Sequence, residues 1–572
     1  MRNTCPRLGL GLIFLTVLFA QERSQSGLEF EGARPMISEP ERSAHAMIAS
    51  AHELATEVGL GILRRGGNAV DAAVAVCFAL AVVHPEAGNL GGGGYMLVRM
   101  SDGRVRAFDY KETVPLAARL TSFPDSQRAY VGYKTAGVPG TVAGLALAHE
   151  RFGRLPWAVV LEPARLLAER GFPASQRMEI VLRLQVPVMK DYPEAAKVFL
   201  HGSDKPLKQG ELVKQPDLAA TIERLRKFGP REFYEGETAR LIAADMKAGG
   251  GFITLDDLKQ YQAIGREPLR GTYRGYQVLT MPPSSSGGFV LLEMLNTLQR
   301  FPMELGMEGS AHSRHLLVEA MRRGFRDRLL YSADPAETEV PLDKLLSESY
   351  ADRQAESVRQ DDRITPLREL EPVETADWVE SPHTTHFSVV DAEGNMVSNT
   401  YTLGNFYGSQ VIPKGTGVLL GDMVGAMASS EKADAGRPRL NPLKGGTRLV
   451  STMAPTIVMR PDGSPWLALG TPGGVTIPST LLQVLVNLID YKMPLRDAIE
   501  YPRIHDQFPQ DRIEAEPGAI VRDVAEKLLE FGYRLNPRLR SQGDVHAVAI
   551  EPKTGMRQGW SDGRRGGHAK GY

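Results

Sequence analysis

Apolar residues recur at helical spacing from Ala51 to Val83, the clearest periodic pattern in the chain. The run Arg-Arg-Gly-Gly-Asn at residues 64–68 interrupts this pattern and predicts a glycine turn between two helices, the second beginning near Ala69. Every residue from Ala72 to Val83 is apolar, so we expect the second helix to be buried on all sides. Two further helices are predicted at Leu218–Phe228 and His312–Tyr331.

Short segments rich in β-branched and aromatic residues predict strands elsewhere. Residues 95–98 and 105–110 flank a Ser-Asp-Gly turn. Residues 451–458 predict a polar turn that leads into a strand, and residues 466–470 predict a strand that ends at the turn Thr-Pro-Gly-Gly. Turns of this composition can aim backbone N–H groups outward, as a site that stabilises an oxyanion requires.

The segment from Thr384 to Leu403 predicts a β-hairpin, because two β-rich flanks enclose the three-residue loop Ala-Glu-Gly. If Asp391 pairs with Asn395, the antiparallel register places Thr384 opposite Thr402. Two hydroxyl groups then face each other across the strands. Such a pair is often only a structural cross-strand contact, and the hairpin alone does not separate that role from a chemical one.

The first twenty residues differ from the rest of the chain. Arg2 and Arg7 precede a largely apolar run from Leu8 to Ala20, and polar residues follow. This run of 13 residues is shorter than the roughly 20 that a membrane-spanning helix needs. It predicts a signal peptide at residues 1–20, cleaved near Ala20, and a secreted or periplasmic protein with no membrane span after its removal.

The composition is that of an ordinary soluble enzyme. Of the 572 residues 42% are hydrophobic and 24% charged, and the formal net charge is −1, which argues against disorder, nucleic-acid binding and polybasic membrane attachment. The two cysteines are Cys5, which would leave with the signal peptide, and Cys77, so no internal disulfide can form in the mature chain. Because Cys77 lies in the apolar run, we expect a buried hydrophobic residue rather than a reactive thiol.

Two other motifs are weak candidates for chemistry. Four consecutive glycines at residues 91–94 predict a close approach of backbones, but no Gly-Lys-Ser/Thr follows and the run leads into a strand, which argues against phosphate binding. His312 and His315 share a helical face, but no third ligand follows at a recognisable spacing, so no metal site is expected. The order of residues for a Ser-His-Asp triad is also absent.

The chain resembles the gamma-glutamyltranspeptidase (glutathione hydrolase) family over nearly all of its predicted mature length. The resemblance rests on an ordered set of motifs rather than on one of them. The motifs are Gly66-Gly67-Asn68-Ala69-Val70-Asp71-Ala72-Ala73, His84-Pro85, Gly88-Asn89-Leu90-Gly91-Gly92-Gly93-Gly94, Gly137-Val138-Pro139-Gly140-Thr141-Val142-Ala143-Gly144, Thr384-Thr385-His386, Thr400-Tyr401-Thr402 and Pro472-Gly473-Gly474.

The resemblance implies an α+β fold with four layers, α/β/β/α, typical of N-terminal-nucleophile hydrolases. It also implies that one precursor cleaves itself into a large subunit, residues 21–383, and a small subunit, residues 384–572, which stay together as one co-folded heterodimer. Thr384 would attack the carbonyl of His383 and afterwards carry a free α-amine that serves as its general base. No cofactor and no metal are implied.

The resemblance also assigns roles to other residues. Thr402 would hydrogen-bond to the Thr384 hydroxyl, Gly473 and Gly474 would line the oxyanion hole, and Lys111, Ser451 and Thr452 would contact the carboxylate of the donor. The implied donor is glutathione or another γ-glutamyl amide, and the implied acceptor is water, an amino acid or a dipeptide.

Three contacts to the donor's α-amino acid group depart from the family's pattern. They are Lys111 where the family has arginine, Gly404 where it has asparagine with Asn405 adjacent, and Gly425 with Ala426 where it has an acidic pair, Asp422 being the nearest carboxylate. Hydrogen bonds to charged groups are worth about 1.5–3 kcal/mol each, so these changes would weaken γ-glutamyl selectivity. An acylase for glutaryl or cephalosporin-type side chains and a non-catalytic binding protein, cleaved or uncleaved, therefore remain alternatives.

Overall fold

The structure, a computed structural model, describes residues 39–123, 130–200, 204–359, 361–370, 383–433, 440–537 and 541–572. The fold described below lies within one compact unit, Glu41–Tyr572. The predicted signal peptide at residues 1–20 lies outside the described residues. Within the described ranges, no helix is long and apolar enough to cross a membrane.

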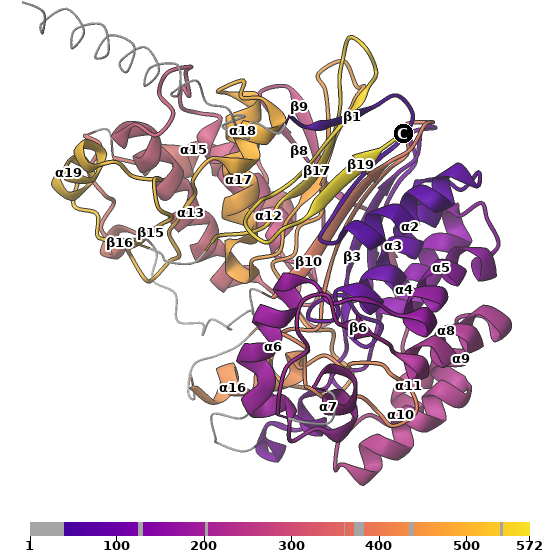
Figure 1. Cartoon of the computed structure of the whole chain (residues 1–572). Helices are drawn as coiled ribbons and strands as arrows, with labels where there is room; N and C mark the ends of the chain where they lie inside the picture. Colours follow the sequence, from indigo (N-terminus) through magenta and orange to yellow (C-terminus); the bar gives the residue numbers. More distant parts are fainter. Residues whose placement is uncertain are drawn as a thin grey trace, which may run out of the picture. The chain divides into compact units, whose positions relative to one another are not determined.

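Two seven-stranded sheets form the centre of the described unit (Figure 1). The first sheet has the order β19 (His568–Gly571), β2 (Met47–Ser50), β10 (Thr384–Val390), β11 (Met396–Thr402), β3 (Gly93–Arg99), β4 (Val105–Asp109) and β7 (Ile264–Arg266). The second has the order β1 (Glu41–Ser43), β18 (Arg557–Ser561), β17 (His546–Ile550), β13 (Pro465–Gly470), β12 (Thr456–Met459), β9 (Tyr276–Thr280) and β8 (Leu269–Tyr273).

The two sheets pack face to face through small and polar side chains as well as apolar ones. The Ser398 hydroxyl on β11 donates to the carbonyl of Leu469 on β13 at 2.8 Å, and the Ser388 hydroxyl on β10 donates to the carbonyl of His546 on β17 at 2.9 Å. Because these bonds satisfy polar groups that are fully buried, they fix the position of β10 and β11 against the second sheet.

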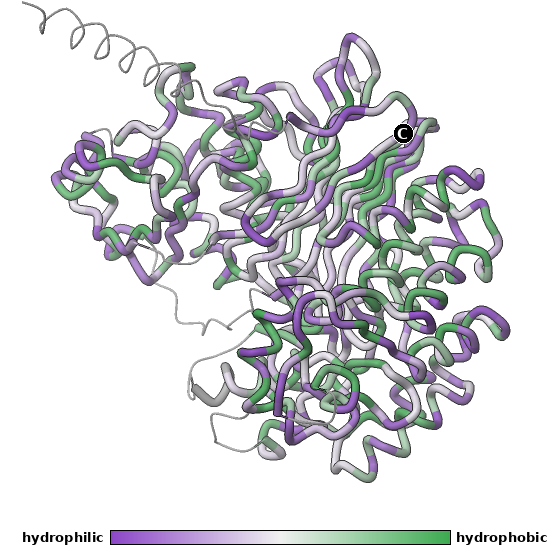
Figure 2. Tube along the Cα trace, in the orientation of Figure 1, coloured by the Kyte–Doolittle hydropathy of each residue, from purple (hydrophilic) through white to green (hydrophobic). Residues whose placement is uncertain are grey.

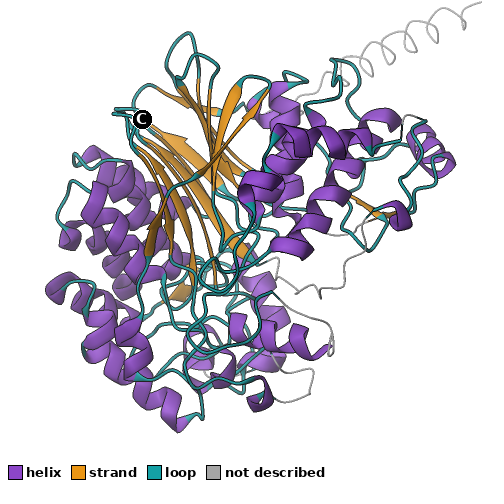
Figure 3. Cartoon of the chain, turned by 180° about the vertical axis from the view of Figure 1, so that it is seen from behind, coloured by secondary structure: helices purple, strands orange, loops and turns teal. Residues whose placement is uncertain are grey.

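Helices cover the outer faces of both sheets, as the view from behind also shows (Figure 3). On the first sheet lie α2 (Glu53–Arg64), α3 (Ala69–Val83) and α4 (Thr141–Phe152), and α5 (Trp157–Arg170) packs on α3. On the second lies α12 (Gly287–Leu298), against which α13 (Ala311–Tyr331) and α17 (Ile477–Ile489) pack. Hydrophobic residues concentrate along the strands and the adjacent helices (Figure 2). The predicted α+β arrangement of four layers, α/β/β/α, is confirmed.

The remaining helices surround this core. They include α6 (Gln176–Met189), α7 (Pro193–Phe199), α8 (Pro216–Phe228), α9 (Glu232–Glu235), α10 (Glu237–Ala248), α11 (Leu255–Gln260), α14 (Leu342–Leu345), α15 (Glu348–Glu356), α16 (Met423–Ala433), α18 (Leu495–Glu500) and α19 (Arg522–Glu530). Two small sheets pair β5 (Phe172–Pro173) with β6 (Leu212–Val213), and β14 (Ile504–His505) and β16 (Leu535–Pro537) with β15 (Ile513–Ala515).

The predicted helix pair α2 and α3 is confirmed. The turn between the two helices explains why the apolar pattern is interrupted there. Gly66 has a φ of +87°, and Asn68 caps α3 while Asp71 accepts a hydrogen bond from the N–H of Asn68 at 2.9 Å. The N–H of Ala69 donates to Asp391 at 2.8 Å. The start of α3 is therefore tied to the tip of the predicted hairpin.

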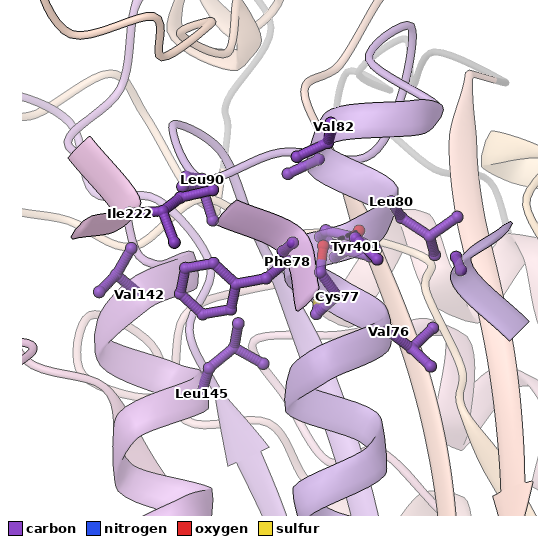
Figure 4. Packing of buried hydrophobic residues seen from close by; sticks show 14 of the residues in the cluster. Val76, Cys77, Phe78, Leu80, Val82, Leu90, Val142, Leu145, Ile222 and Tyr401 are labelled. Carbon is purple, nitrogen blue, oxygen red and sulfur yellow. Dashed lines mark hydrogen bonds between the residues drawn. The ribbon is translucent and has the colours of Figure 1, made fainter. Parts of the chain in front are cut away.

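All fifteen residues of α3 are buried, as the continuous apolar run predicts. In Figure 4 the Phe78 ring points toward Val142, Leu145 and Ile222, and Cys77 lies beside Tyr401 of β11. Burial raises the pKa of the Cys77 thiol, so the thiolate does not form near neutral pH. The prediction of Cys77 as a buried residue on a core helix is confirmed.

Candidate active site

The predicted hairpin is present with the predicted register. Thr384 pairs with Thr402 across β10 and β11, and the carbonyl of Asn395 accepts a hydrogen bond from the N–H of Asp391 at 3.1 Å. Gly394 has a φ of +82°, the left-handed conformation that a three-residue hairpin loop needs at its last position. Because the two threonines are directly opposite at the ends of their strands, their side chains lie on the same face and at the same end of the sheet.

The glycine run brings β3 unusually close to this end of β11. A Cβ atom at Gly92 would lie 2.2 Å from the carbonyl oxygen of Thr402, and one at Gly94 would lie 2.4 Å from Cβ of Tyr401. No side chain fits at either position without moving the backbone. The glycines thus serve the close backbone approach that the sequence predicts.

The Thr402 hydroxyl makes two hydrogen bonds that determine its direction. It accepts from the N–H of Gly404 at 2.9 Å and donates to the carbonyl oxygen of His383 at 3.2 Å. A hydroxyl has one proton to donate, and here that proton points at the carbonyl oxygen of the His383–Thr384 peptide bond. Thr402 therefore polarises the carbonyl that a nucleophile at Thr384 would attack.

A carboxylate that the sequence did not assign holds the turn after Thr402. Asp422 accepts hydrogen bonds from the backbone N–H of Asn405 at 3.0 Å and from its side-chain amide at 2.6 Å. Gly404 has a φ of +97°, and a Cβ there would lie 1.8 Å from the Asp422 carboxylate. Burial, opposed by these hydrogen bonds and reinforced by the charge of Glu112, raises the pKa of Asp422 to about 7. The hydrogen bonds between Asp422 and Asn405 hold the N–H of Gly404 toward Thr402.

The predicted glycine turn leaves the second sheet at the same end. The backbone of Gly470, the last residue of β13, lies against the ring of His386, two residues beyond Thr384. Since β13 and β10 run in opposite directions here, the turn that follows leads toward Thr384. Gly473 and Gly474 have φ of +148° and +58°, which favours glycine at both positions.

Ser451 and Thr452 lie beside this turn and are fully buried. The Thr452 hydroxyl donates to the carbonyl of Gly474 at 2.8 Å, and the carbonyl of Ser451 accepts from the N–H of Ser286 at 2.7 Å. The Ser451 hydroxyl oxygen accepts from the N–H of Met453 at 3.1 Å. The Thr452 hydroxyl therefore holds the glycine turn, whereas the Ser451 hydroxyl holds the local turn at Met453.

Lys111 also lies at this end, because β4 runs antiparallel to β3 and residue 111 continues past its last pair. Its Nζ lies 2.7 Å from the carboxylate of Glu112, and both side chains are fully buried. The guanidinium of Arg448 donates to the backbone carbonyl of Lys111 at 2.7 Å. The positive charge predicted to meet a donor carboxylate is thus already paired within the chain.

The structure brings the seven predicted site residues to one end of the two sheets, and it adds His386. This fully buried ring bonds to the hydroxyls of Thr400 at 2.8 Å and Ser388 at 3.0 Å. Burial, with a smaller effect of His546, lowers the pKa of His386 well below 6.5, so the ring is neutral. The Thr-Thr-His motif was the signal that could have identified it.

The histidine pair on α13 has a structural role. His312 bonds through Nδ1 to Asp362 at 2.6 Å, and Nδ1 of His315 lies 2.7 Å from the hydroxyl of Tyr533. Among the described residues, no group of His, Cys, Asp and Glu side chains is arranged to hold a metal ion.

Two stacked sheets between helical layers, with a threonine at the first position of a central strand, define an enzyme of the N-terminal-nucleophile hydrolase class. The family model for gamma-glutamyltranspeptidase matches residues 55–572. The chain belongs to the gamma-glutamyltranspeptidase family.

Similar proteins and solved structures include both glutathione hydrolases and acylases. The glutathione hydrolase proenzyme of Escherichia coli (strain K12) is 38% identical over 93% of this chain and 93% of its own. The acylase ACY 1 proenzyme of Pseudomonas sp. (strain SE83) is 35% identical over 90% and 91%. The crystal structure of cephalosporin acylase from Bacillus halodurans superposes with a TM-score of 0.83 at 26% identity, covering 94% of this chain and 98% of that one.

Proposed function

We propose that the chain is the proenzyme of a gamma-glutamyl hydrolase and transferase that cleaves itself between His383 and Thr384. The observation that carries this proposal is the hydrogen bond from the Thr402 hydroxyl to the His383 carbonyl, at the register position opposite Thr384. A merely structural threonine pair would not place a donor on the peptide bond preceding the first residue of the strand.

Self-cleavage would proceed through an ester. The Thr384 hydroxyl oxygen bonds to the carbonyl carbon of His383, the bond from that carbon to the Thr384 nitrogen breaks, and the hydroxyl proton ends on that nitrogen. Water then adds across the ester, which leaves a carboxylate on His383 and restores the hydroxyl of Thr384. The products are the large subunit, residues 21–383, and the small subunit, residues 384–572, in one heterodimer.

In the processed enzyme the free α-amine of Thr384 takes the proton of its own hydroxyl, since α-amines titrate near 7.7–8.0 in model compounds. Thr402 would orient this hydroxyl, and the N–H groups of Gly473 and Gly474 would stabilise the oxyanion. Ser451, Thr452 and Lys111 would contact the donor. The acyl group passes to Thr384, the leaving amine takes the proton, and water, an amino acid or a dipeptide receives the acyl group.

The proposed donors are glutathione and related γ-glutamyl amides, which agrees with the name of the E. coli relative. Export follows from the predicted signal peptide, so the enzyme would work in the periplasm or outside the cell.

A second candidate is an acylase for glutaryl or cephalosporin-type amides. The pairing of Lys111 with Glu112, and of Asp422 with Asn405, favours it, since neither pair leaves a carboxylate for the donor's α-ammonium. Buried Gly425 and Ala426 add none at the family's acidic positions.

Intact mass and turnover test both candidates. Purified wild type, Thr384→Ala and Thr385→Val are each assayed with a γ-glutamyl anilide and a glutaryl anilide. Thr385 points to the opposite face of β10 and serves as the matched control. Cleavage before Thr384 in wild type and the control, with γ-glutamyl turnover, supports the lead proposal. Cleavage with glutaryl turnover alone selects the acylase, and an intact, inactive wild type refutes both.

A further inference from the structure

The side chain of His383, the last residue before the proposed cleavage, packs against a residue with no assigned role. The rings of His383 and Phe406 are stacked, with centroids 3.5 Å apart and planes inclined by 23°. Phe406 is partly buried and lies four residues after Thr402. The stack and the Thr402 hydrogen bond therefore hold one residue from two sides, the ring by Phe406 and the carbonyl by Thr402.

The turn that carries Phe406 is tied down on each flank. Before it, the side-chain amide of Asn405 donates to Asp422. After it, the N–H of Tyr407 donates to the carbonyl of Glu86 at 3.2 Å. The carbonyl of Phe406 itself accepts from the side chain of Gln410 at 2.8 Å. The backbone is thus held at three consecutive residues, which fixes the direction in which the Phe406 side chain leaves the chain.

A guanidinium supports the same ring. The Arg177 carbon Cζ lies 5.9 Å from the centroid of Phe406, and Arg177 is itself fixed by an ion pair with Glu86 at 3.1 Å. Glu86 is fully buried and also pairs with His84 at 3.1 Å. Burial opposes ionisation of Glu86, but His84 and Arg177 outweigh it and lower its pKa to about 2, so the ion pair persists at neutral pH.

We propose that Phe406, supported by Arg177, is a positioning residue for self-cleavage that clamps the His383 side chain and keeps the scissile carbonyl at the hydroxyl of Thr402. The inference rests on the proposed self-cleavage before Thr384. The clamp takes no part in bond making. It restricts rotation of His383. The His383 carbonyl carbon then bonds to the Thr384 oxygen, its bond to the Thr384 nitrogen breaks, and the hydroxyl proton ends on that nitrogen.

The test follows self-cleavage from synthesis onward. Full-length chains are pulse-labelled in a cell-free translation system, and the fraction cleaved is followed on denaturing gels with intact mass confirming the site. An aromatic stack of this kind corresponds to about a 2- to 13-fold change in rate, so Phe406→Leu should slow cleavage by that factor. Phe406→Tyr and Phe406→Trp keep a ring and should restore the rate. Phe252→Leu, which breaks a ring pair with Phe123 instead, is the matched control.

A double-mutant cycle separates the clamp from general packing. His383→Ala keeps the scissile carbonyl and removes only the ring. Combined with Phe406→Leu, it should slow cleavage no more than either single change, because both remove one contact. The midpoint of thermal unfolding is measured for each cleavage-blocked form on a Thr384→Ala background.

The outcomes are distinct. A Phe406→Leu chain that cleaves at the wild-type rate, or effects of Phe406→Leu and His383→Ala that multiply independently, would overturn the clamp while leaving the proposed function intact. A wild-type chain that stays uncleaved would overturn both. Slowing by Phe406→Leu with rescue by the two aromatic variants, and no effect of Phe252→Leu, would support the clamp.

Discussion

Replacing Gly404 by alanine should slow self-cleavage at least 100-fold. The φ of +97° at this position is unfavourable for a residue with a side chain by about 1–2 kcal/mol. The new Cβ would also lie 1.8 Å from the Asp422 carboxylate, which must move away. That movement sacrifices two hydrogen bonds from Asn405 to a carboxylate, worth about 1.5–3 kcal/mol each. The sum, about 4–8 kcal/mol, exceeds the about 2.7 kcal/mol that corresponds to a 100-fold change.

The backbone at Gly404 would relax rather than bear this strain, and its N–H would leave the Thr402 hydroxyl. The assay is the time course of cleavage at His383/Thr384 by intact mass, with the thermal unfolding midpoint recorded alongside. A Gly404→Ala/Asp422→Ala double variant, in which the collision is gone, should cleave faster than Gly404→Ala. Cleavage of Gly404→Ala within threefold of wild type, or a double variant no faster than the single one, would refute the reasoning.

Three further changes have defined outcomes. Thr402→Val removes the donor to the scissile carbonyl and should slow cleavage by about 10²–10³-fold, whereas Thr402→Ser should retain most of the rate, both read as intact mass over time. The folded-state pKa of Asp422, about 7, lies above its ordinary value near 3.8, so the folded chain binds the extra proton and loses stability as pH rises between these values; Asp422→Asn should flatten that part of the curve of unfolding midpoint against pH. Glu319→Ala removes the carboxylate shared by two buried arginines of α13, Arg322 and Arg323, of which Arg322 keeps its ion pair with the half-buried Asp511, and should destabilise the chain by about 3–5 kcal/mol, seen as a fall in the unfolding midpoint that the exposed control Glu237→Ala does not share.

The features that could be predicted from sequence are those that local rules determine. The register of Thr384 against Thr402 follows from a loop length and a period of two, and the two helices up to Val83 follow from apolar spacing and a glycine turn. The proposed site residues gather at one end of the sheets because the strands that carry them are neighbours. The resemblance implied the four layers, but the order of those strands was not predicted and comes from the structure.

Side-chain pairing over long sequence separations could not be predicted in this way. Asp422 and Asn405 meet only because the chain folds back after β11, and no periodicity in either segment indicates that contact. Lys111 and Glu112 are adjacent in sequence, yet alternation on a strand would send them to opposite faces; they pair because the strand ends at Asp109. The stack of Phe406 on His383 likewise depends on how the turn after Thr402 is held.

The order of strands has a consequence for the fate of the two products. A cut before Thr384 would assign β2 to one product and β19 and β10, its hydrogen-bonded neighbours on both sides, to the other. In the second sheet β1 and β9 would likewise border a block of four strands from the opposite product. Separation of the two products would require breaking the hydrogen bonds between several pairs of neighbouring strands in both sheets at once. The products would therefore be held together by a kinetic barrier comparable to that of unfolding rather than by an ordinary interface. A protein built this way would be expected to lose activity by global unfolding and not by dilution.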